Sequence, residues 1–180
     1  QVQGLSGVVA IAAGYGSFAI RADGTVWGWG TNHAGTLGSG LPYVAQTATP
    51  VQVVGLSNIR SLAVGTLPCY ALRKDGVVMA WGDYGNTPTP ASAVHEFAGL
   101  TGFIDLNNAG TDGFFTLALK NDGTVWGWGF PDSGVLGPGL PDGISAAPRQ
   151  LPGVSGVKSV AACNHTSVFI KNDGSVRRTS

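Results

Sequence analysis

Charged side chains are scarce in this sequence. They make up 11% of its 180 residues, against roughly 25% in an average soluble domain. Ten basic and ten acidic residues leave no net charge, so the chain lacks the basic surface of a nucleic-acid binder or of a protein drawn to anionic lipid. No apolar run reaches the roughly 18 residues that a membrane-spanning helix needs. We therefore expect no nucleic-acid partner and no membrane insertion.

The residue groupings that usually carry catalysis or hold a metal are missing as well. The sequence has no His-x-x-x-His or Cys-x-x-Cys pair that would suit zinc. It also has no Gly-x-Ser-x-Gly elbow for a serine nucleophile and no phosphate loop ending in Gly-Lys-Ser/Thr. We therefore expect no enzyme activity, no metal and no cofactor.

Cysteine is limited to Cys69 and Cys163. Two separate buried thiols are the simpler interpretation, and a disulfide stays open because spacing alone does not fix pairing. The low charge, together with abundant Gly, Thr and Ser, favours an extracellular or cell-surface location.

Glycine, by contrast, is abundant, with 29 residues. A hydrophobic fraction of 43% and five tryptophans argue that this glycine belongs to a folded core with many turns rather than to a disordered chain. The stretch Asp23–Gly30, DGTVWGWG, returns almost unchanged as Asp122–Gly129. Asp75–Gly82 is a weaker copy and Asp173–Ser180 an altered one. Copies about 50 residues apart are typical of a propeller or a solenoid.

Each repeat has the same predicted strand order. In the first, apolar runs predict strand A at Val8–Ala13, strand B at Ser17–Arg21, strand C at Val26–Gly30 and, after a long loop, strand D at Pro50–Val54. The Asp-Gly pair between strands B and C predicts a type I′ hairpin turn, with positive φ at both central residues. No amphipathic helix of ten or more residues is evident.

These units predict one all-β repeat domain over residues 1–180. Its fold class is a β-propeller of four-stranded antiparallel blades, with about four units in the chain. The unit boundaries fall near residues 4–54, 55–98, 99–152 and 153–180, with Gln1–Gln3 as a candidate closing strand.

The repeat resembles that of the regulator of chromosome condensation family. The resemblance rests on Ala12-Ala13-Gly14, Ser17–Ile20, Asp23–Gly30, Leu37-Gly38 and Pro50, and later on Asn164-His165-Thr166. It implies a β-propeller, usually of seven blades with about 50 residues in each repeat. Propellers of this family serve nucleotide exchange, enzyme inhibition, ubiquitin ligases and bacterial surfaces, so the resemblance implies a fold and leaves the function open.

The recurring residues have structural explanations. We expect the Asp-Gly pairs to shape hairpins and the tryptophans to pack between blades, although a sugar- or base-stacking platform is the alternative for the tryptophans. These repeat residues are Asp23, Gly24, Trp27, Trp29, Asp75, Gly76, Trp81, Asp122, Gly123, Trp126, Trp128, Asp173 and Gly174.

The loops that differ between units are the candidate binding surface. In a four-stranded meander the A–B and C–D loops emerge at the same end, and aromatic residues on loops held by a rigid scaffold are typical of protein contacts. The alternative is that these side chains only cover the blade ends. The candidates are Tyr15, His33, Tyr43, Leu67, Tyr84, Phe114, Phe130 and His165.

The sequence therefore predicts a non-enzymatic β-propeller module that recognises another protein through this loop face. A structural subunit of an extracellular polymer or surface assembly is one alternative, and a carbohydrate-binding propeller is another. A four-blade arc of a seven-blade family would expose two blade faces. We therefore expect an arc completed by copies of itself or by a larger ring, with Gln1–Gln3 paired to a strand C, rather than an isolated closed ring.

Overall fold

The structure is a computed structural model of the chain. It describes residues 1–40, 46–65, 68–82, 93–97, 100–108, 115–129, 145–163 and 166–179. Over these residues it is almost entirely β, and one short 3-10 turn, η1 (His33–Gly35), is the helical element that the described part contains. None of the described helical structure is long and apolar enough to cross a bilayer.

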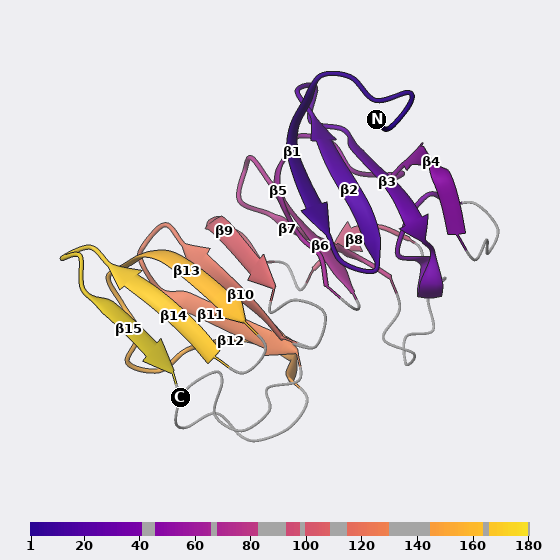
Figure 1. Ribbon diagram of the computed structural model, residues 1–180. Coiled ribbons are helices and arrows are strands. Elements are labelled where there is room, and N and C mark those ends of the chain that lie inside the picture. Colours follow the sequence, from indigo (N-terminus) through magenta and orange to yellow (C-terminus); the bar gives the residue numbers. More distant parts are fainter. Residues whose placement is uncertain are drawn as a thin grey trace.

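The strands form four antiparallel sheets, each in the order of the sequence. We call these sheets blades 1 to 4 (Figure 1). Blade 1 contains β1 (Val8–Ala13), β2 (Gly16–Arg21), β3 (Val26–Thr31) and β4 (Gln46–Gln52). Blade 2 contains β5 (Ile59–Ala63), β6 (Cys69–Arg73), β7 (Val78–Trp81) and β8 (His95–Glu96). Blade 3 contains β9 (Phe103–Asn108), β10 (Phe115–Lys120), β11 (Val125–Gly129) and β12 (Ser145–Gln150). Blade 4 contains β13 (Val157–Cys163), β14 (Thr166–Lys171) and β15 (Val176–Thr179).

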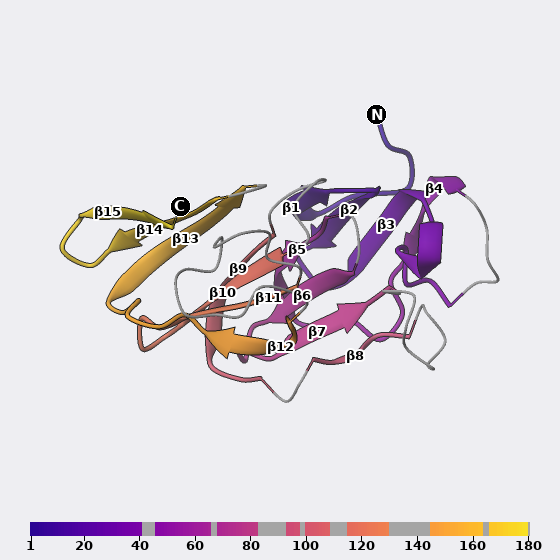
Figure 2. The ribbon, with the colours of Figure 1, turned by 90° about the horizontal axis from the view of Figure 1, so that it is seen from below.

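The blades follow one another along an arc. The first strands of successive blades, β1, β5, β9 and β13, contact one another in order. Blades 1 and 4 therefore lie at opposite ends (Figures 1 and 2). The prediction of an all-β, propeller-type stack of four-stranded meanders is confirmed for blades 1 to 3, and blade 4 shows three of the four strands.

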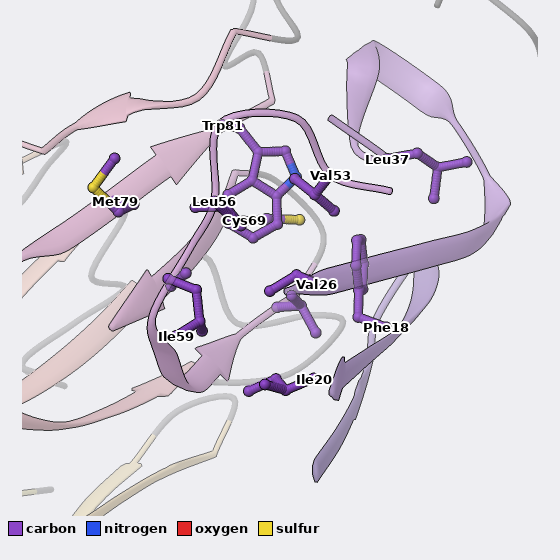
Figure 3. Close-up of a cluster of buried hydrophobic side chains, with 12 residues drawn as sticks. Phe18, Ile20, Val26, Leu37, Val53, Leu56, Ile59, Cys69, Met79 and Trp81 are labelled. Carbon is purple, nitrogen blue, oxygen red and sulfur yellow. The ribbon is translucent and has the colours of Figure 1, made fainter. Parts of the chain in front are cut away.

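The core lies between the blades rather than inside any one of them. Phe18, Ile20 and Val26 of blade 1 meet Ile59 and Trp81 of blade 2 in one buried cluster (Figure 3). Equivalent clusters join blade 2 to blade 3 and blade 3 to blade 4. Because blades 2 and 3 are each covered on both faces by a neighbouring blade, their strands β6 and β10 are almost wholly buried, which explains their near-continuous apolar sequences.

The hairpin turns differ from the prediction. In blade 1 the Arg21 N–H donates to the Thr25 carbonyl at 2.9 Å, and the Gly24 N–H donates to the Arg21 carbonyl at 2.8 Å. This three-residue loop is a type I turn followed by a left-handed residue, Gly24, with φ +80°. The type I′ prediction was wrong, because Asp23 does not adopt positive φ. Its side chain instead accepts a hydrogen bond from the Thr25 N–H at 2.9 Å, which is an Asx turn and stabilises the three-residue loop.

The same loop recurs in the other three blades, and in blades 1 to 3 its glycine carbonyl bonds to the next blade. The Gly24 carbonyl accepts a hydrogen bond from the Ile59 N–H of blade 2 at 3.2 Å. Gly76 and Gly123 accept equivalent bonds from Phe103 at 3.2 Å and Val157 at 3.1 Å. The turns are therefore hairpin ends and inter-blade junctions at once.

The ends of some elements also differ from the sequence-based limits. The fourth strand of blade 1 was predicted at Pro50–Val54 and lies at Gln46–Gln52. Val53 and Val54 leave the ladder, and their N–H groups donate to Val26 and Gly38. Gln1–Gln3 belongs to no strand, so it does not pair with a strand C of its own chain, and pairing with a strand C of another chain stays a prediction.

Candidate functional site

The loop end of blade 1 brings two of the predicted binding residues together. Tyr15 lies between β1 and β2, directly before Gly16, and His33 begins the turn η1 after β3. Their rings lie edge to face with centroids 6.4 Å apart. Tyr15 is 46% exposed, and His33 is exposed as well. Two aromatic rings from different loops therefore form one exposed pair.

The backbone under Tyr15 is fixed by the neighbouring blade. The Tyr15 N–H donates to the Gly65 carbonyl of blade 2 at 3.3 Å. A Cβ at Gly14 would lie 2.4 Å from the same carbonyl oxygen, so this position admits only glycine. The loop is thus held at the blade 1–blade 2 junction, which limits the conformations open to Tyr15.

The turn that carries His33 is also anchored. The Asn32 side chain accepts a hydrogen bond from the Leu37 N–H at 2.9 Å, and the Thr36 hydroxyl donates to the His33 carbonyl at 2.7 Å. Leu37 is buried in the core between the blades (Figure 3). The indole N–H of Trp81 donates to the Thr36 carbonyl at 2.7 Å. His33 therefore projects from a turn that two blades hold in place.

The remaining predicted binding residues fall outside the described part of the chain. Their grouping with Tyr15 and His33 stays a prediction. They are Tyr43, Leu67, Tyr84, Phe114, Phe130 and His165.

The tryptophans of the repeat act mainly in packing. Trp81 and Trp128 are buried, and they meet Phe18 and Tyr70 of the preceding blades edge to face, with centroids 6.0 and 5.4 Å apart. Neither can offer a ring face to a sugar or a base. Trp126 is half-buried in the junction between blades 2 and 3. Trp27 and Trp29 are half-buried on the outer face of blade 1, which no described blade covers, so the expected packing between blades is not seen for these two.

The recurring aspartates are occupied by their own turns. The Asp23 carboxylate accepts hydrogen bonds from the hydroxyl and N–H of Thr25 at 2.6 and 2.9 Å, and these bonds hold the pKa of Asp23 below its usual value. Asp122 and Asp173 are bonded alike to Thr124 and Ser175. Asp75 instead pairs with Arg73 and accepts a bond from the Val77 N–H.

No metal or thiol chemistry emerges from the described residues. They contain no group of three His, Cys, Asp or Glu side chains placed to hold a metal ion. Cys69 is a free, buried thiol, and burial raises its pKa far above the usual range, so it stays protonated. Cys69 is therefore a core residue, as the simpler interpretation expects for it. The side chain of Cys163 lies outside the described part of the chain, so its burial stays a prediction.

One feature escaped the sequence-based prediction. A pocket of about 430 Å³ opens on blade 4 beside Phe169, Lys171, Arg177 and Thr179. The signal for it was visible, because the fourth copy of the repeat replaces Trp-Gly-Trp by Arg177-Arg178-Thr179.

Comparison with known proteins agrees with the fold. The model of the regulator of chromosome condensation (RCC1) repeat matches residues 23–72. Human E3 ubiquitin-protein ligase HERC2 is 31% identical over 195 residues, a match that covers 97% of this chain and 4% of HERC2. Human WBSCR16 superposes with a TM-score of 0.80 at 22% identity, over 99% of this chain and 49% of that one. Prp20p of Saccharomyces cerevisiae gives 0.77 at 23% identity, over 98% and 46%.

The stacked meanders and these superpositions define an arc of a β-propeller, which spans about half the length of the two solved chains. The chain belongs to the RCC1 repeat family.

Proposed function

We propose that this arc is part of a non-enzymatic propeller that binds another protein through the loop face of blade 1. The observation that carries the proposal is the exposed Tyr15–His33 pair on a backbone held by two blades. Aromatic rings with little freedom to lose are the residues that most often anchor protein interfaces.

The family likeness supports a protein ligand. Prp20p, which shares the fold, is described together with its binding to Gsp1p and histones, and its complex with Kap60 has also been solved. No residue of this chain can be matched to those contacts, so the proposal names the class of ligand and the surface, and not a particular partner.

The test is site-specific photo-crosslinking in the full protein, in the organism that makes it. A benzophenone side chain at Tyr15 should capture one dominant protein. The same side chain at Asn172, which is exposed on the hairpin end of blade 4, serves as the control. The captured protein, once purified, should bind the wild type and lose at least about tenfold in affinity to the Tyr15→Ala/His33→Ala variant. Equal capture at both positions, or unchanged affinity, would overturn the proposal.

A second candidate, a subunit of a larger assembly, is supported by the two ends of the arc. Ile11 pairs with Ala19 as Leu106 pairs with Ala118, yet Ile11 is 80% exposed while Leu106 is buried against blade 2. At the other end Val176 is 65% exposed, whereas its counterpart in blade 3, Val125, is fully buried. Apolar faces of this kind are normally covered by another surface.

We propose that further blades cover these faces, from a second copy or from the same polypeptide. Sedimentation of the native particle should give a mass above the 18.3 kDa of residues 1–180. A native particle of that single mass would exclude this assembly.

A carbohydrate ligand is less well supported than a protein ligand, since Trp81 and Trp128 are buried. Specific binding on a glycan array would favour the carbohydrate ligand instead.

The location remains a proposal from composition. Low charge and abundant Gly, Thr and Ser support an extracellular or cell-surface protein. Immunoblots of separated culture fluid, envelope and cytoplasm would test it, and a purely cytoplasmic signal would contradict it.

A further inference from the structure

The pocket of blade 4 can be compared with the equivalent position on blade 3, which lies in the junction between blades 2 and 3 and is filled by side chains. Trp126 and Trp128 project from β11 into that junction, with Phe103 6.3 Å from Trp126 between ring centroids. The Lys120 ammonium lies over the Trp126 ring at 4.8 Å and over the Phe103 ring at 5.3 Å. Leu100 packs against the same cluster.

Each of these side chains has a counterpart in blade 4, fixed by the shared hairpin geometry. Val157 pairs with Lys171 as Phe103 pairs with Lys120. Phe169 pairs with Arg177 as Ala118 pairs with Trp126. Counted from the turn aspartates, Arg177 and Thr179 stand where blade 3 has Trp126 and Trp128. Val154 precedes Val157 by three residues, as Leu100 precedes Phe103.

All of these blade 4 counterparts line the 430 Å³ pocket. The pocket therefore lies where two indoles and a phenyl ring sit one junction earlier. Phe169 is buried and replaces the smaller Ala118, so it fills part of the lost volume. The remaining space falls within the range of small-molecule and side-chain binding sites.

The pocket also carries positive charge. In blade 3 the cation Lys120 lies over the face of Trp126. In blade 4 the equivalent Lys171 has Arg177 at the position of that tryptophan, so a second cation replaces the ring. Arg178 lines the pocket as a third cation. The turn carboxylate of Asp173 accepts two hydrogen bonds from Ser175, at 2.7 and 2.8 Å. These bonds, together with the charges of Lys171 and Arg177, lower the pKa of Asp173, so this carboxylate offsets part of the positive charge. Among the described residues no ion pair holds any of the three cations.

We propose that this pocket binds a planar aromatic group that carries a carboxylate, either a free aromatic acid or an acidic-aromatic segment of a protein. The ring replaces the missing indole against Phe169 and Val157, and the carboxylate meets Lys171 and Arg177. Apolar walls with a few convergent polar groups suit such a ligand, and guanidinium groups bind carboxylates well. The site is independent of the Tyr15–His33 surface, which lies at the other end of the arc (Figure 1).

Indole-3-acetate is the first probe, titrated into the chain by calorimetry or by NMR. We expect saturable binding, and uncharged indole should bind at least about tenfold more weakly because it lacks the carboxylate. Arg177→Gln should weaken indole-3-acetate by about tenfold. Lys74→Gln, an exposed position in the hairpin of blade 2, removes the same charge away from the pocket and should leave binding unchanged.

Thr179→Trp restores the side chain that blade 3 carries. It should raise the thermal midpoint and abolish binding of indole-3-acetate. If that variant does not fold, Arg177→Trp makes the same test from the neighbouring position. No saturable binding by the wild type, or binding that survives both Arg177→Gln and a folded Trp variant, would overturn the proposal.

The two sources of the ligand are separated by a second probe. The capped tripeptide Asp-Trp-Asp presents the same indole beside carboxylates on a peptide backbone. Tighter and competitive binding of the tripeptide identifies a protein segment as the ligand, and tighter binding of indole-3-acetate identifies a free aromatic acid. If neither displaces the other, they do not share the pocket, and the proposal fails.

Discussion

At the scale of single residues, glycine is required in the hairpin turns for two different reasons, its backbone conformation and its small size. Each adopts positive φ, between +80° and +84°. At Gly123 an added Cβ would also lie 3.1 Å from the Gly156 N and 3.2 Å from its Cα, in the next blade. At Gly174 it would meet nothing within 4 Å. Conformation is therefore required at both, and small size only at Gly123.

This difference predicts unequal costs for the same substitution. Gly174→Val should destabilise the fold by about 1–2 kcal/mol, from the left-handed backbone alone. Gly123→Val should cost more, because it also pushes on the backbone of blade 4. Urea unfolding of the two variants provides the measurement. Equal costs would show that the close contact across the junction can relax.

The turn aspartates predict how stability depends on pH. Hydrogen bonds from Thr25, Thr124 and Ser175 lower the pKa values of Asp23, Asp122 and Asp173 below the ordinary 3.8. A carboxyl with a lowered folded-state pKa contributes stability that is complete above its unfolded pKa and is lost as the pH falls through its folded pKa. We therefore expect the thermal midpoint to drop below about pH 4, since that is the ordinary range of aspartate.

Asp23→Asn/Asp122→Asn should flatten that drop, because the amide oxygen still accepts the turn hydrogen bonds but does not titrate. Asp105 acts in the opposite direction, since burial raises its pKa. If the thermal midpoint of the double variant falls with pH as steeply as that of the wild type, the acid sensitivity comes from groups other than Asp23 and Asp122.

At the scale of elements, the third strands of blades 2 and 3 bring a buried tryptophan, Trp81 or Trp128, to the junction with the preceding blade. Trp128→Ala removes a fully buried ring that contacts Tyr70 and Phe97, and should cost roughly 3–5 kcal/mol of unfolding free energy. Trp29→Ala, the equivalent change on the outer face of blade 1, should cost clearly less, because Trp29 is only half-buried. Chemical denaturation measures both. A stable Trp128→Ala protein would contradict a packing role.

Strands were the part of the fold that sequence predicted best. β1 has the predicted limits, because it is an apolar run ended by glycine, and β2 and β3 each differ from the prediction by one residue. β4 was predicted too far along the chain. Its own side chains are exposed or half-buried, so its sequence carries little apolar signal. The prediction followed Val53 and Val54 instead, which lie just after the strand, with Val53 buried in the core and Val54 exposed.

The sites were harder to predict than the strands. Tyr15 and His33 were singled out as loop aromatics, but their contact depends on how two loops are anchored across a blade junction. The blade 4 pocket could not be predicted from any single residue. It exists because Arg177 and Thr179 fail to fill a space that their counterparts fill, and that space is visible only once the junctions are compared.

At the scale of the whole molecule, the exposed ends predict how the isolated arc behaves. Ile11→Lys/Val176→Lys places a charge on each open face, where neither side chain contributes to a junction within the chain. We expect the double variant of residues 1–180 to stay folded and to self-associate less than the wild type in sedimentation velocity. A loss of folding in the variant would mean that these faces support the chain itself.

The hydrogen bonds from one turn to the next blade have a further consequence for how the molecule comes apart. Because they join only adjacent blades, at Gly24–Ile59, Gly76–Phe103 and Gly123–Val157, cooperativity passes along the arc from neighbour to neighbour, as in a one-dimensional chain of coupled units. Blades 2 and 3 have two neighbours, and blades 1 and 4 have one each. The arc therefore frays from its ends, and amide hydrogens exchange with solvent first in β1 and β15 and last in β6 and β10.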